Sequence, residues 1–439
     1  PDPFIPDPGC LISISRLPDF FHRAFEGTAT LNYIQSKVSS VIISSSDNVL
    51  VCAPTGAGKT NIALMAVLKE MQEYEGKMDQ FKAVYIAPMK ALVHEVIEGF
   101  TKRLSEYNVN VVELTGDANS SAEELRRAHI IVATPEKWDV VSRKANDLSF
   151  TRMVRLIILD EIHLLHDERG PVLEAIVMRI KRDIEAKRER VRLIGLSATL
   201  PNYVDVAKFI NATPQSTFMF DGSHRPVPLE QRFISLTEDK PFKRAAKLNE
   251  ICYSLVMDRL STQTLVFVHS RKDTVKTAKF IIDRAVADDH IGKLALGLGE
   301  PDGDEFEFEN QDLQSVIKYG VAFHNAGLSR KDRNHVERLF SQGKIRVLVS
   351  TATLAWGVNL PARTVIIKGT QVYRPAVGWS ELSGQDVLQM MGRAGRPQYD
   401  VTGEGIIMCA DPVQLPFYMS LSTMQLPIES QMIGKLDNH

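Results

Sequence analysis

Cysteine is scarce in this chain, and its scarcity excludes two kinds of stabilising site. The 439 residues include four cysteines, which are scattered and form no C-x-x-C pair. We therefore expect neither a disulfide framework nor a zinc site of the usual spacing. This cysteine usage is typical of a reducing, intracellular compartment.

Long hydrophobic runs and a strong net charge are also absent. No apolar stretch approaches the length of a membrane-spanning helix, and the first residues do not resemble a signal peptide. The 52 basic and 54 acidic side chains give a formal net charge of −2. Any nucleic acid must therefore be bound by a local groove rather than by bulk charge.

Two series of short apolar runs indicate two α/β domains. The runs are continuous and alternate with longer amphipathic stretches, which favours parallel sheets covered by helices on both faces. The first series lies near residues 48–52, 83–86, 110–114, 130–132, 156–159 and 193–196, and the second near 264–268, 320–323, 346–349, 364–367 and 405–408.

The domain boundaries follow from breaks in this pattern. A glycine and two prolines between residues 221 and 228 disfavour helix and indicate a linker. The acidic, glycine-containing segment 297–312 is interpreted as an exposed insertion rather than a metal loop, because its spacing does not match a calcium loop. We predict an N-terminal arm at 1–30, domains at 31–220 and 231–425, a linker at 221–230 and a tail at 426–439.

The clearest motif is CAPTGAGKT at residues 52–60, between an apolar run and a helical pattern. A strand, a glycine-rich turn and a helix in this order form a phosphate cradle, in which backbone N–H groups and the helix N-terminus face one anion. An ordinary glycine turn is the alternative, but this context favours the cradle. The predicted nucleotide-binding residues are Thr55, Gly56, Ala57, Gly58, Lys59 and Thr60, and Thr60 is also predicted to ligate Mg²⁺.

Two further motifs in the first domain follow apolar runs. In DEIH at residues 160–163, Asp160 is predicted to hold Mg²⁺ and Glu161 to deprotonate the attacking water. A charged turn is the alternative for this pair taken alone. In SAT at residues 197–199, the hydroxyls of Ser197 and Thr199 can hydrogen-bond the carboxylates and report their state to another domain.

The second domain contains QMMGRAGRP at residues 389–397. If residues 386–394 are helical, Arg393 and Arg396 share a face and can clamp the transferring phosphate, together with Gln389. A solvated basic turn is the alternative.

This ordered set of motifs resembles the superfamily 2 DExH-box helicases of the ratchet-type branch, over nearly the whole chain. The supporting segments include APMKAL at 87–92, TGD at 115–117, TPEKW at 134–138, VHSR at 268–271 and STATLAWGVNLP at 350–361. The resemblance implies two tandem RecA-like P-loop domains that use ATP and Mg²⁺.

The resemblance also implies roles for individual residues. Gln35 would read the adenine, with an aromatic such as Phe25 stacked on it. Gly357 and Asn359 would contact the nucleotide, and His163 would couple it to the second domain. The implied RNA contacts are Pro88, Thr115, Gly116, Thr134, Ser270, Arg271 and Thr351.

Within this branch, IHLLHDERGPVLE at 162–174, IKGTQVY at 367–373 and LPIESQ at 426–431 are similar to the first, active cassette of tandem-cassette spliceosomal helicases. This similarity implies a nuclear RNA helicase that unwinds the U4/U6 snRNA duplex with snRNP protein partners. Winged-helix and ratchet domains would follow in the full-length protein. A tandem-cassette DNA helicase of alkylation repair and a catalytically silent ATP-binding scaffold remain as alternatives.

Residues 369–383 have the pattern of a β-hairpin. Strand-like residues at 371–373 and 379–382 flank turn residues at 374–378, which predicts a loop of four or five residues. In the ratchet-type branch a hairpin at this place separates base pairs. Tyr373 or Trp379 would brace it or stack on a terminal base, unless these aromatics pack on their own domain.

Overall fold

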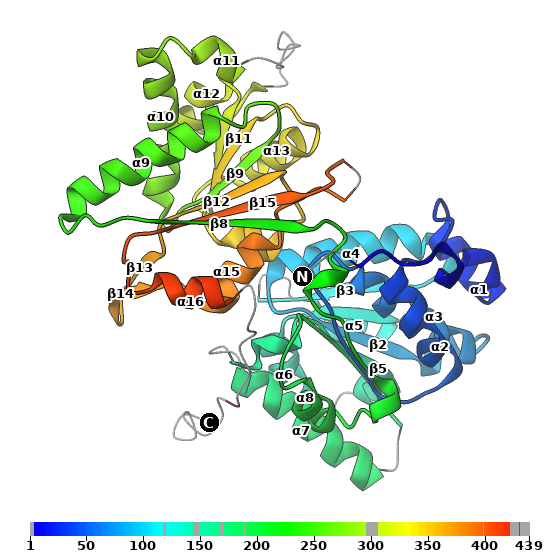
Figure 1. The fold of residues 1–439 in the computed structure, drawn as a ribbon. Coiled ribbons are helices and arrows are strands. Elements are labelled where there is room, and N and C mark those ends of the chain that lie inside the picture. The colour runs from blue at the N-terminus through cyan, green and yellow to red at the C-terminus, as the bar shows by residue number, and fades with distance from the viewer. Residues whose placement is uncertain are drawn as a thin grey trace. The chain divides into compact units, whose positions relative to one another are not determined.

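A computed structural model describes the chain at residues 4–116, 120–143, 149–166, 170–187, 190–295, 306–397, 399–421 and 430. The chain divides into two compact units, here called unit 1 (Pro1–Arg225 with Gln425–His439) and unit 2 (Pro226–Met424) (Figure 1). The acidic stretch 297–305 and the tail 426–439, apart from Ser430, lie outside the described residues. No helix within the described ranges is long and apolar enough to cross a membrane.

Unit 1 contains a seven-stranded sheet in the order β3-β4-β2-β5-β6-β1-β7, with every pairing parallel. The six predicted runs form β1 to β6, whereas β7 escaped prediction because it is short and only half-buried. The strands are β1 (Val49–Cys52), β2 (Lys82–Ile86), β3 (Val111–Leu114), β4 (Ile130–Ala133), β5 (Val154–Leu159), β6 (Arg192–Ser197) and β7 (Thr217–Met219).

Successive side chains of each central strand belong to two different cores, as the alternation of a strand requires. Val49 and Val51 of β1 pack with α2, α3 and α4, whereas Leu50 and Cys52 pack with α6, α7 and α8. The sheet is therefore covered on both faces, which explains why its strands are continuously apolar. The helices are α1 (Asp19–His22), α2 (Tyr33–Ser44), α3 (Lys59–Glu73), α4 (Lys90–Arg103), α5 (Ala122–Arg127), α6 (Pro135–Arg143), α7 (Gly170–Lys187) and α8 (Tyr203–Phe209).

The segment before α2 is part of the core of unit 1. Leu17, Phe21 and Phe25 pack into the same cluster as α2, α3 and α4. The Phe25 ring is 1% exposed, and the guanidinium of Arg103 lies 4.6 Å from its centroid. The expectation that Phe25 stacks on an adenine is therefore wrong, because neither face of the ring is open to a base.

Unit 2 contains a six-stranded parallel sheet in the order β10-β11-β9-β12-β15-β8. Together the two sheets and their helices confirm the predicted α/β fold class. Strand β8 escaped prediction because it is a half-exposed strand at the edge of the sheet. The strands are β8 (Leu229–Ser235), β9 (Thr264–Phe267), β10 (Val321–His324), β11 (Val347–Ser350), β12 (Thr364–Lys368) and β15 (Gly403–Cys409).

The helices of unit 2 alternate with these strands, as in unit 1. The long helices α9 and α10 contact each other, and α10 also contacts β10 and β11. The helices are α9 (Pro241–Met257), α10 (Arg271–Ala287), α11 (Ile291–Ala295), α12 (Gln311–Ile317), α13 (Arg330–Ser341), α14 (Thr353–Gly357), α15 (Gly384–Met391) and α16 (Leu415–Ser420).

The predicted hairpin is confirmed, with a shorter loop than expected. Strands β13 (Gln371–Arg374) and β14 (Gly378–Glu381) pair antiparallel. Arg374 pairs with Gly378, whose φ of 82° lies in the left-handed region, so residues 375–377 alone form the loop. Our prediction missed this because Arg374 and Gly378 were both assigned to the turn.

We expect Phe25→Ala to destabilise unit 1 by about 3–5 kcal/mol, because a large ring leaves a closed core. Urea unfolding of the chain should show a lower midpoint for this variant. Phe242→Ala is the matched control, since Phe242 is 87% exposed and its removal should change stability by no more than about 0.5 kcal/mol. An unchanged midpoint for Phe25→Ala would contradict the burial described here.

Candidate functional site

Three neighbouring strands of unit 1 bring the predicted catalytic motifs together. Strands β5, β6 and β1 are adjacent, with Leu159 paired to Gly195 and Cys52 to Ser197. All strands are parallel, so the loops that follow these three start at the same edge of the sheet. The phosphate loop, the DEIH segment and the SAT segment therefore form one candidate site.

The phosphate loop has the geometry of an anion cradle. Gly56 and Gly58 both have φ of 80°, a left-handed conformation that favours glycine. Gly58 is the N-cap of α3, and no side chain caps this helix, so the first-turn N–H groups can face an anion. Lys59 Nζ donates to the carbonyls of Ala53 (2.8 Å) and Pro54 (3.2 Å). These groups fit a phosphate.

The start of α2 supports the phosphate loop from one side. Asn32 and Gln35 form a capping box, and their amides donate to Ala57 O (2.9 Å) and Gly58 O (3.0 Å). The predicted adenine reader Gln35 thus holds the loop in this structure. Asn32 escaped prediction, although N-x-x-Q before an apolar run is a recognisable capping signature.

Asp160 lies where a divalent cation would relieve its charge. Its Oδ2 accepts from Tyr85 Oη (2.6 Å), and its Oδ1 accepts from Glu161 N (2.9 Å). Desolvation, together with the nearby Glu161 carboxylate, raises the pKa of Asp160 to about 7. An oxygen donor of this kind fits Mg²⁺. Tyr85 escaped prediction; its signal was a polar-tipped side chain within an aliphatic strand.

His163 connects Glu161 to the SAT segment. Burial and the charge of Lys59 lower the pKa of His163 to about 3, so the ring is neutral at physiological pH. Its Nδ1 accepts from the backbone N–H of Ala198 (3.1 Å), which leaves the ring proton on Nε2. That atom lies 3.1 Å from Glu161 Oε2, and Glu161 itself has a left-handed φ of 54°. The ring therefore lies between the Ala198 amide and the Glu161 carboxylate, and its Nε2 makes no hydrogen bond within the described residues.

In this structure the hydroxyls of the SAT segment donate to backbone carbonyls. Ser197 Oγ donates to Ala198 O (2.7 Å), and Thr199 Oγ1 donates to Phe220 O (3.2 Å). Neither of these bonds reaches a carboxylate. The segment instead contacts His163 through the Ala198 amide, and His163 lies 3.1 Å from Glu161. This contact depends on backbone position, which the side-chain pattern could not indicate.

The predicted RNA contacts of unit 1 follow the other half of the same sheet. Pro88 follows β2, Thr115 and Gly116 follow β3, and Thr134 follows β4, and these strands are adjacent in the order β3-β4-β2. The Thr115 side chain is fully buried, and its hydroxyl donates to Glu113 Oε1 (2.6 Å). The residue as a whole is buried, so neither its hydroxyl nor its backbone is open to a ligand in this structure.

In unit 2 the predicted arginine pair does not share a helical face. Helix α15 ends at Met391, because the glycine-rich segment that follows turns the chain, with φ of 90° at Gly395. Arg393 and Arg396 therefore lie beyond the helix, and the expectation of a helical face was wrong. Gln389, within α15, is buried.

Both arginines are bound within unit 2. Arg393 Nε donates to Ala355 O (3.0 Å), and its Nη1 donates to Asn359 Oδ1 (3.2 Å), close to Gly357 at the end of α14. Arg396 makes a two-pronged contact with Asp400, with Nε–Oδ2 at 2.9 Å and Nη2–Oδ1 at 2.8 Å.

The predicted RNA contacts of unit 2 follow the adjacent strands β11 and β9. Ser270 caps α10, and its Oγ accepts from Asp273 N (3.1 Å), which leaves its hydroxyl proton free to donate. Arg271 is exposed at the first position of α10. The Thr351 and Thr353 hydroxyls lie 2.7 Å apart.

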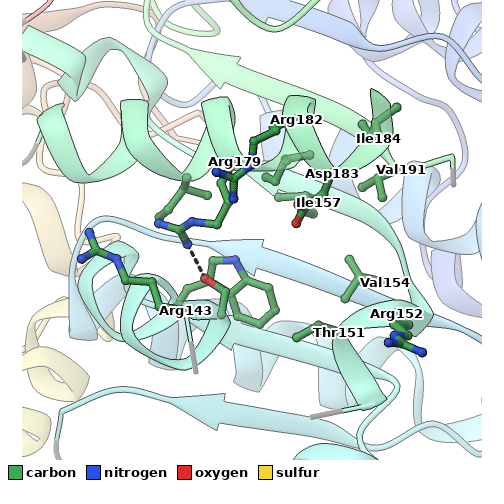
Figure 2. A pocket seen from close by; sticks show the side chains of 14 residues that line it. Arg143, Thr151, Arg152, Val154, Ile157, Arg179, Arg182, Asp183, Ile184 and Val191 are labelled. Atoms are coloured by element: carbon green, nitrogen blue, oxygen red, sulfur yellow. Dashed lines mark hydrogen bonds between the residues drawn. The ribbon is translucent and has the colours of Figure 1, made fainter. Parts of the chain in front are cut away.

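A cavity of about 350 Å³ in unit 1 contains none of the predicted site residues. It lies between α6 and α7, over the first residues of β5. Its apolar floor includes Trp138 and Ile157. Figure 2 shows Arg179 among the residues that line it, and its Nη1 donates to the Ser142 hydroxyl (2.7 Å). The cavity lies near the start of β5, away from the strand ends that carry the predicted catalytic motifs.

Comparison with known families agrees with the motif order. The sequence profile described as DEAD/DEAH box helicase matches residues 32–206, and the profile described as helicase conserved C-terminal domain matches residues 303–398. The first match begins at the capping residue Asn32 and includes the phosphate loop and the DEIH and SAT segments. The second includes the residues that follow β11 and α15.

Curated relatives extend this likeness over almost the whole chain. The chain is 53% identical over 440 residues to pre-mRNA-splicing factor brr2 of Schizosaccharomyces pombe and 53% identical over 439 residues to the U5 small nuclear ribonucleoprotein 200 kDa helicase of Homo sapiens. It is 51% identical over 438 residues to the DExH-box ATP-dependent RNA helicase DExH12 of Arabidopsis thaliana. Each match covers 97% of this chain but 20% of the relative.

Gly58→Ala should destabilise the chain more than Gly56→Ala. Both positions have φ of 80°, but an added Cβ at Gly58 would lie 2.4 Å from Gln35 Nε2, whereas at Gly56 it would meet nothing within 4 Å. Gly56→Ala therefore measures backbone strain alone, about 1–2 kcal/mol. Thermal unfolding checks both variants, and Gln35→Ala should reduce the effect of Gly58→Ala. Equal losses for the two glycines would contradict the close contact with Gln35.

Asp160→Asn should stabilise the metal-free chain in a pH-dependent way. The pKa of Asp160 rises from 3.8 to about 7 on folding, so the native state binds the proton more tightly than the unfolded state. Protonated Asp160 therefore stabilises the fold at low pH, and this contribution to the free energy of unfolding is lost as pH rises between these two values. Because asparagine cannot ionise, the free energy of unfolding of the variant does not fall in this pH range. In EDTA, the melting temperature of the variant relative to the wild type should increase from pH 5 to pH 8. A difference that is constant with pH would contradict the raised pKa.

Proposed function

Because the chain belongs to the DEAD/DEAH box helicase family, we propose that it hydrolyses ATP and couples hydrolysis to movement along RNA and to duplex unwinding. The observation that carries this proposal is the meeting of three motifs at the ends of β1, β5 and β6. A phosphate cradle, a carboxylate pair and a neutral histidine beside the second carboxylate are the parts that phosphoanhydride hydrolysis needs.

In the proposed reaction, Glu161 accepts a proton from the attacking water. His163 is a positioning residue, because its Nε2 lies 3.1 Å from the Glu161 carboxylate and its other nitrogen is fixed by the backbone. A left-handed φ at Glu161 places the carboxylate next to Asp160 at the strand end. Such strain is typical of functional positions.

The same site would hold ATP with Mg²⁺. The N–H groups of the phosphate loop and Lys59 would bind the phosphates, Thr60 and Asp160 would hold the cation, and Gln35 would contact the adenine. Bound Mg²⁺ would neutralise phosphate charge during transfer. Lys59 would have to exchange its contacts with the Ala53 and Pro54 carbonyls for phosphate oxygens.

Unit 2 would supply cationic groups for the charge that develops in hydrolysis. Arg396 is the stronger candidate for this role, because its ion pair with Asp400 joins residues four apart in the chain and can be exchanged locally. Arg393, which is 8% exposed, holds the end of α14 and Asn359. Gln389 would contribute from the preceding helix.

We propose an RNA substrate bound along the loops that follow β2, β3 and β4 in unit 1 and β9 and β11 in unit 2. Contacts of this kind hold phosphate and sugar without reading bases. The β13–β14 hairpin would separate the strands. The names of the relatives, a splicing factor and a U5 ribonucleoprotein helicase, support the U4/U6 duplex as substrate, snRNP proteins as partners and a nuclear location.

Glu161→Gln should retain nucleotide binding and lose RNA-stimulated turnover by about 10²–10⁴-fold, the usual contribution of a positioned base. Phosphate release with and without single-stranded RNA measures turnover, and a fluorescent nucleotide measures binding. Glu123→Gln is the matched control, because this glutamate is exposed on α5 and paired with Arg127. Turnover near the wild-type rate in Glu161→Gln would refute the role of Glu161 as the base. A wild-type chain without turnover would refute the proposal that this chain hydrolyses ATP.

A further inference from the structure

A large groove in unit 2 has no part in the proposed hydrolysis. It encloses about 900 Å³ between the first half of α9, the first half of α10 and the β13–β14 hairpin. It also touches His269, which follows β9, and Gly369, which follows β12. The groove therefore opens at the same sheet edge as the predicted RNA contact Ser270.

Buried polar contacts hold the walls of this groove in place. Lys368, at the end of β12, is 6% exposed, and its Nζ donates to Asn249 of α9 (2.6 Å) and to Asp273 (3.1 Å) and Thr277 (2.6 Å) of α10. Arg244 of α9 donates to Gln371 Oε1 of the hairpin (3.2 Å). The groove is thus preformed, and a ligand need not order it.

The lining of the groove alternates flat apolar groups with positive charge. Phe242, Tyr373 and Trp379 line it and are 87%, 60% and 71% exposed, and the last two form a cross-strand pair with ring centroids 5.7 Å apart. Aromatic rings exposed to this degree offer faces for stacking.

Most of the positive charge comes from one face of α10, and Arg244 of α9 adds to it. Lys272 and Lys276 lie one turn apart on α10 and both line the groove. Neither lysine has an ion pair with any residue in the described ranges. Lys368 and Asp273, which also line it, neutralise each other, so the groove carries a net positive charge. Its occupant should be anionic and should present flat apolar surfaces.

We propose that this groove binds the unpaired strand that leaves a forked RNA at the hairpin. Single-stranded RNA has the required chemistry, because its bases stack on aromatic rings and its phosphates pair with lysines. The position agrees. Ser270, a predicted contact of the translocating strand, also lines the groove. From there the groove continues past the ends of β9 and β12, on the side away from β11. This inference rests on the proposed function, since it assigns the second strand of the same substrate.

The test compares RNA duplexes that differ by one arm. Fluorescent duplexes carry a single-stranded arm on one strand, or arms on both strands as a fork, and both arm polarities are used. The measured quantity is the ratio of the fork affinity to the one-armed duplex affinity, obtained for the 439-residue chain by fluorescence anisotropy. Wild-type chain should bind the fork more tightly.

Two groove variants should weaken fork binding, one measured by the affinity ratio and the other by the salt dependence of fork affinity. Phe242→Ala should reduce it about fivefold or more, because it removes one stacking face. Lys272→Ala with Lys276→Ala should lower the slope of log affinity against log salt for the fork by about 1.4, or about 0.7 for each lost phosphate contact. The matched controls are Val286→Ala, which is 56% exposed on α10, and Lys243→Ala with Lys293→Ala, both exposed and outside the groove.

Three results would overturn the proposal: equal wild-type affinities for fork and one-armed duplex, groove variants that behave like the controls, or an unchanged salt slope. The second result is also the one expected of a groove that docks a protein. A wild-type chain that prefers the fork but shows no RNA-stimulated ATP turnover would support the groove and overturn the proposed function. The two hypotheses can therefore fail separately.

Discussion

The parallel direction of every strand in the two large sheets is the constraint on which the rest of this structure depends. Parallel strands end at one edge, so residues as far apart in sequence as Lys59, Asp160 and Ser197 start from neighbouring positions. The same constraint places Pro88, Gly116 and Thr134 along the other half of the unit 1 sheet. The proposed nucleotide site and the proposed RNA contact thus occupy the two halves of one sheet edge.

Desolvation shifts the pKa values of two side chains at that edge. The pKa of Asp160 is raised by loss of hydration and by its neighbour Glu161, and the pKa of His163 is lowered by burial. A carboxyl that is costly to ionise favours a cation, and an imidazole that stays neutral can orient Glu161 without adding charge. The surrounding contacts from Tyr85, Ala198 and the capping box of α2 involve no unusual chemistry. They position the reactive groups, and they form only because the chain is folded.

Unit 2 uses polar contacts in a different way. Lys368 joins α9 and α10 to the end of β12, and Arg244 joins α9 to the hairpin. The hairpin thereby becomes one wall of a groove instead of an isolated ribbon, which would be only marginally stable in water. The exposure of Tyr373 and Trp379 contradicts the alternative that these aromatics pack fully on their own domain. It leaves them available to a substrate.

Much of the fold could be predicted from sequence, because buried parallel strands are continuous apolar runs. Strands β1 to β6 of unit 1 and β9 to β12 and β15 of unit 2 were identifiable for this reason. The half-buried strands β7 and β8 were not, because their pattern resembles that of exposed segments. The presence of the hairpin was predictable from its turn residues. The length of its loop was not, because it depended on the pairing of Arg374 with Gly378.

The sequence by itself determined the reactive groups, because phosphate binding, metal binding and proton transfer each require particular side chains in a short motif. Only the tertiary structure decided how those groups are oriented. It buried Phe25 beneath Arg103, ended α15 before Arg393, turned Gln35 toward Gly58 and connected Glu161 to Ala198 through His163. These outcomes depend on packing between segments distant in sequence, and no local pattern of residues encodes such contacts.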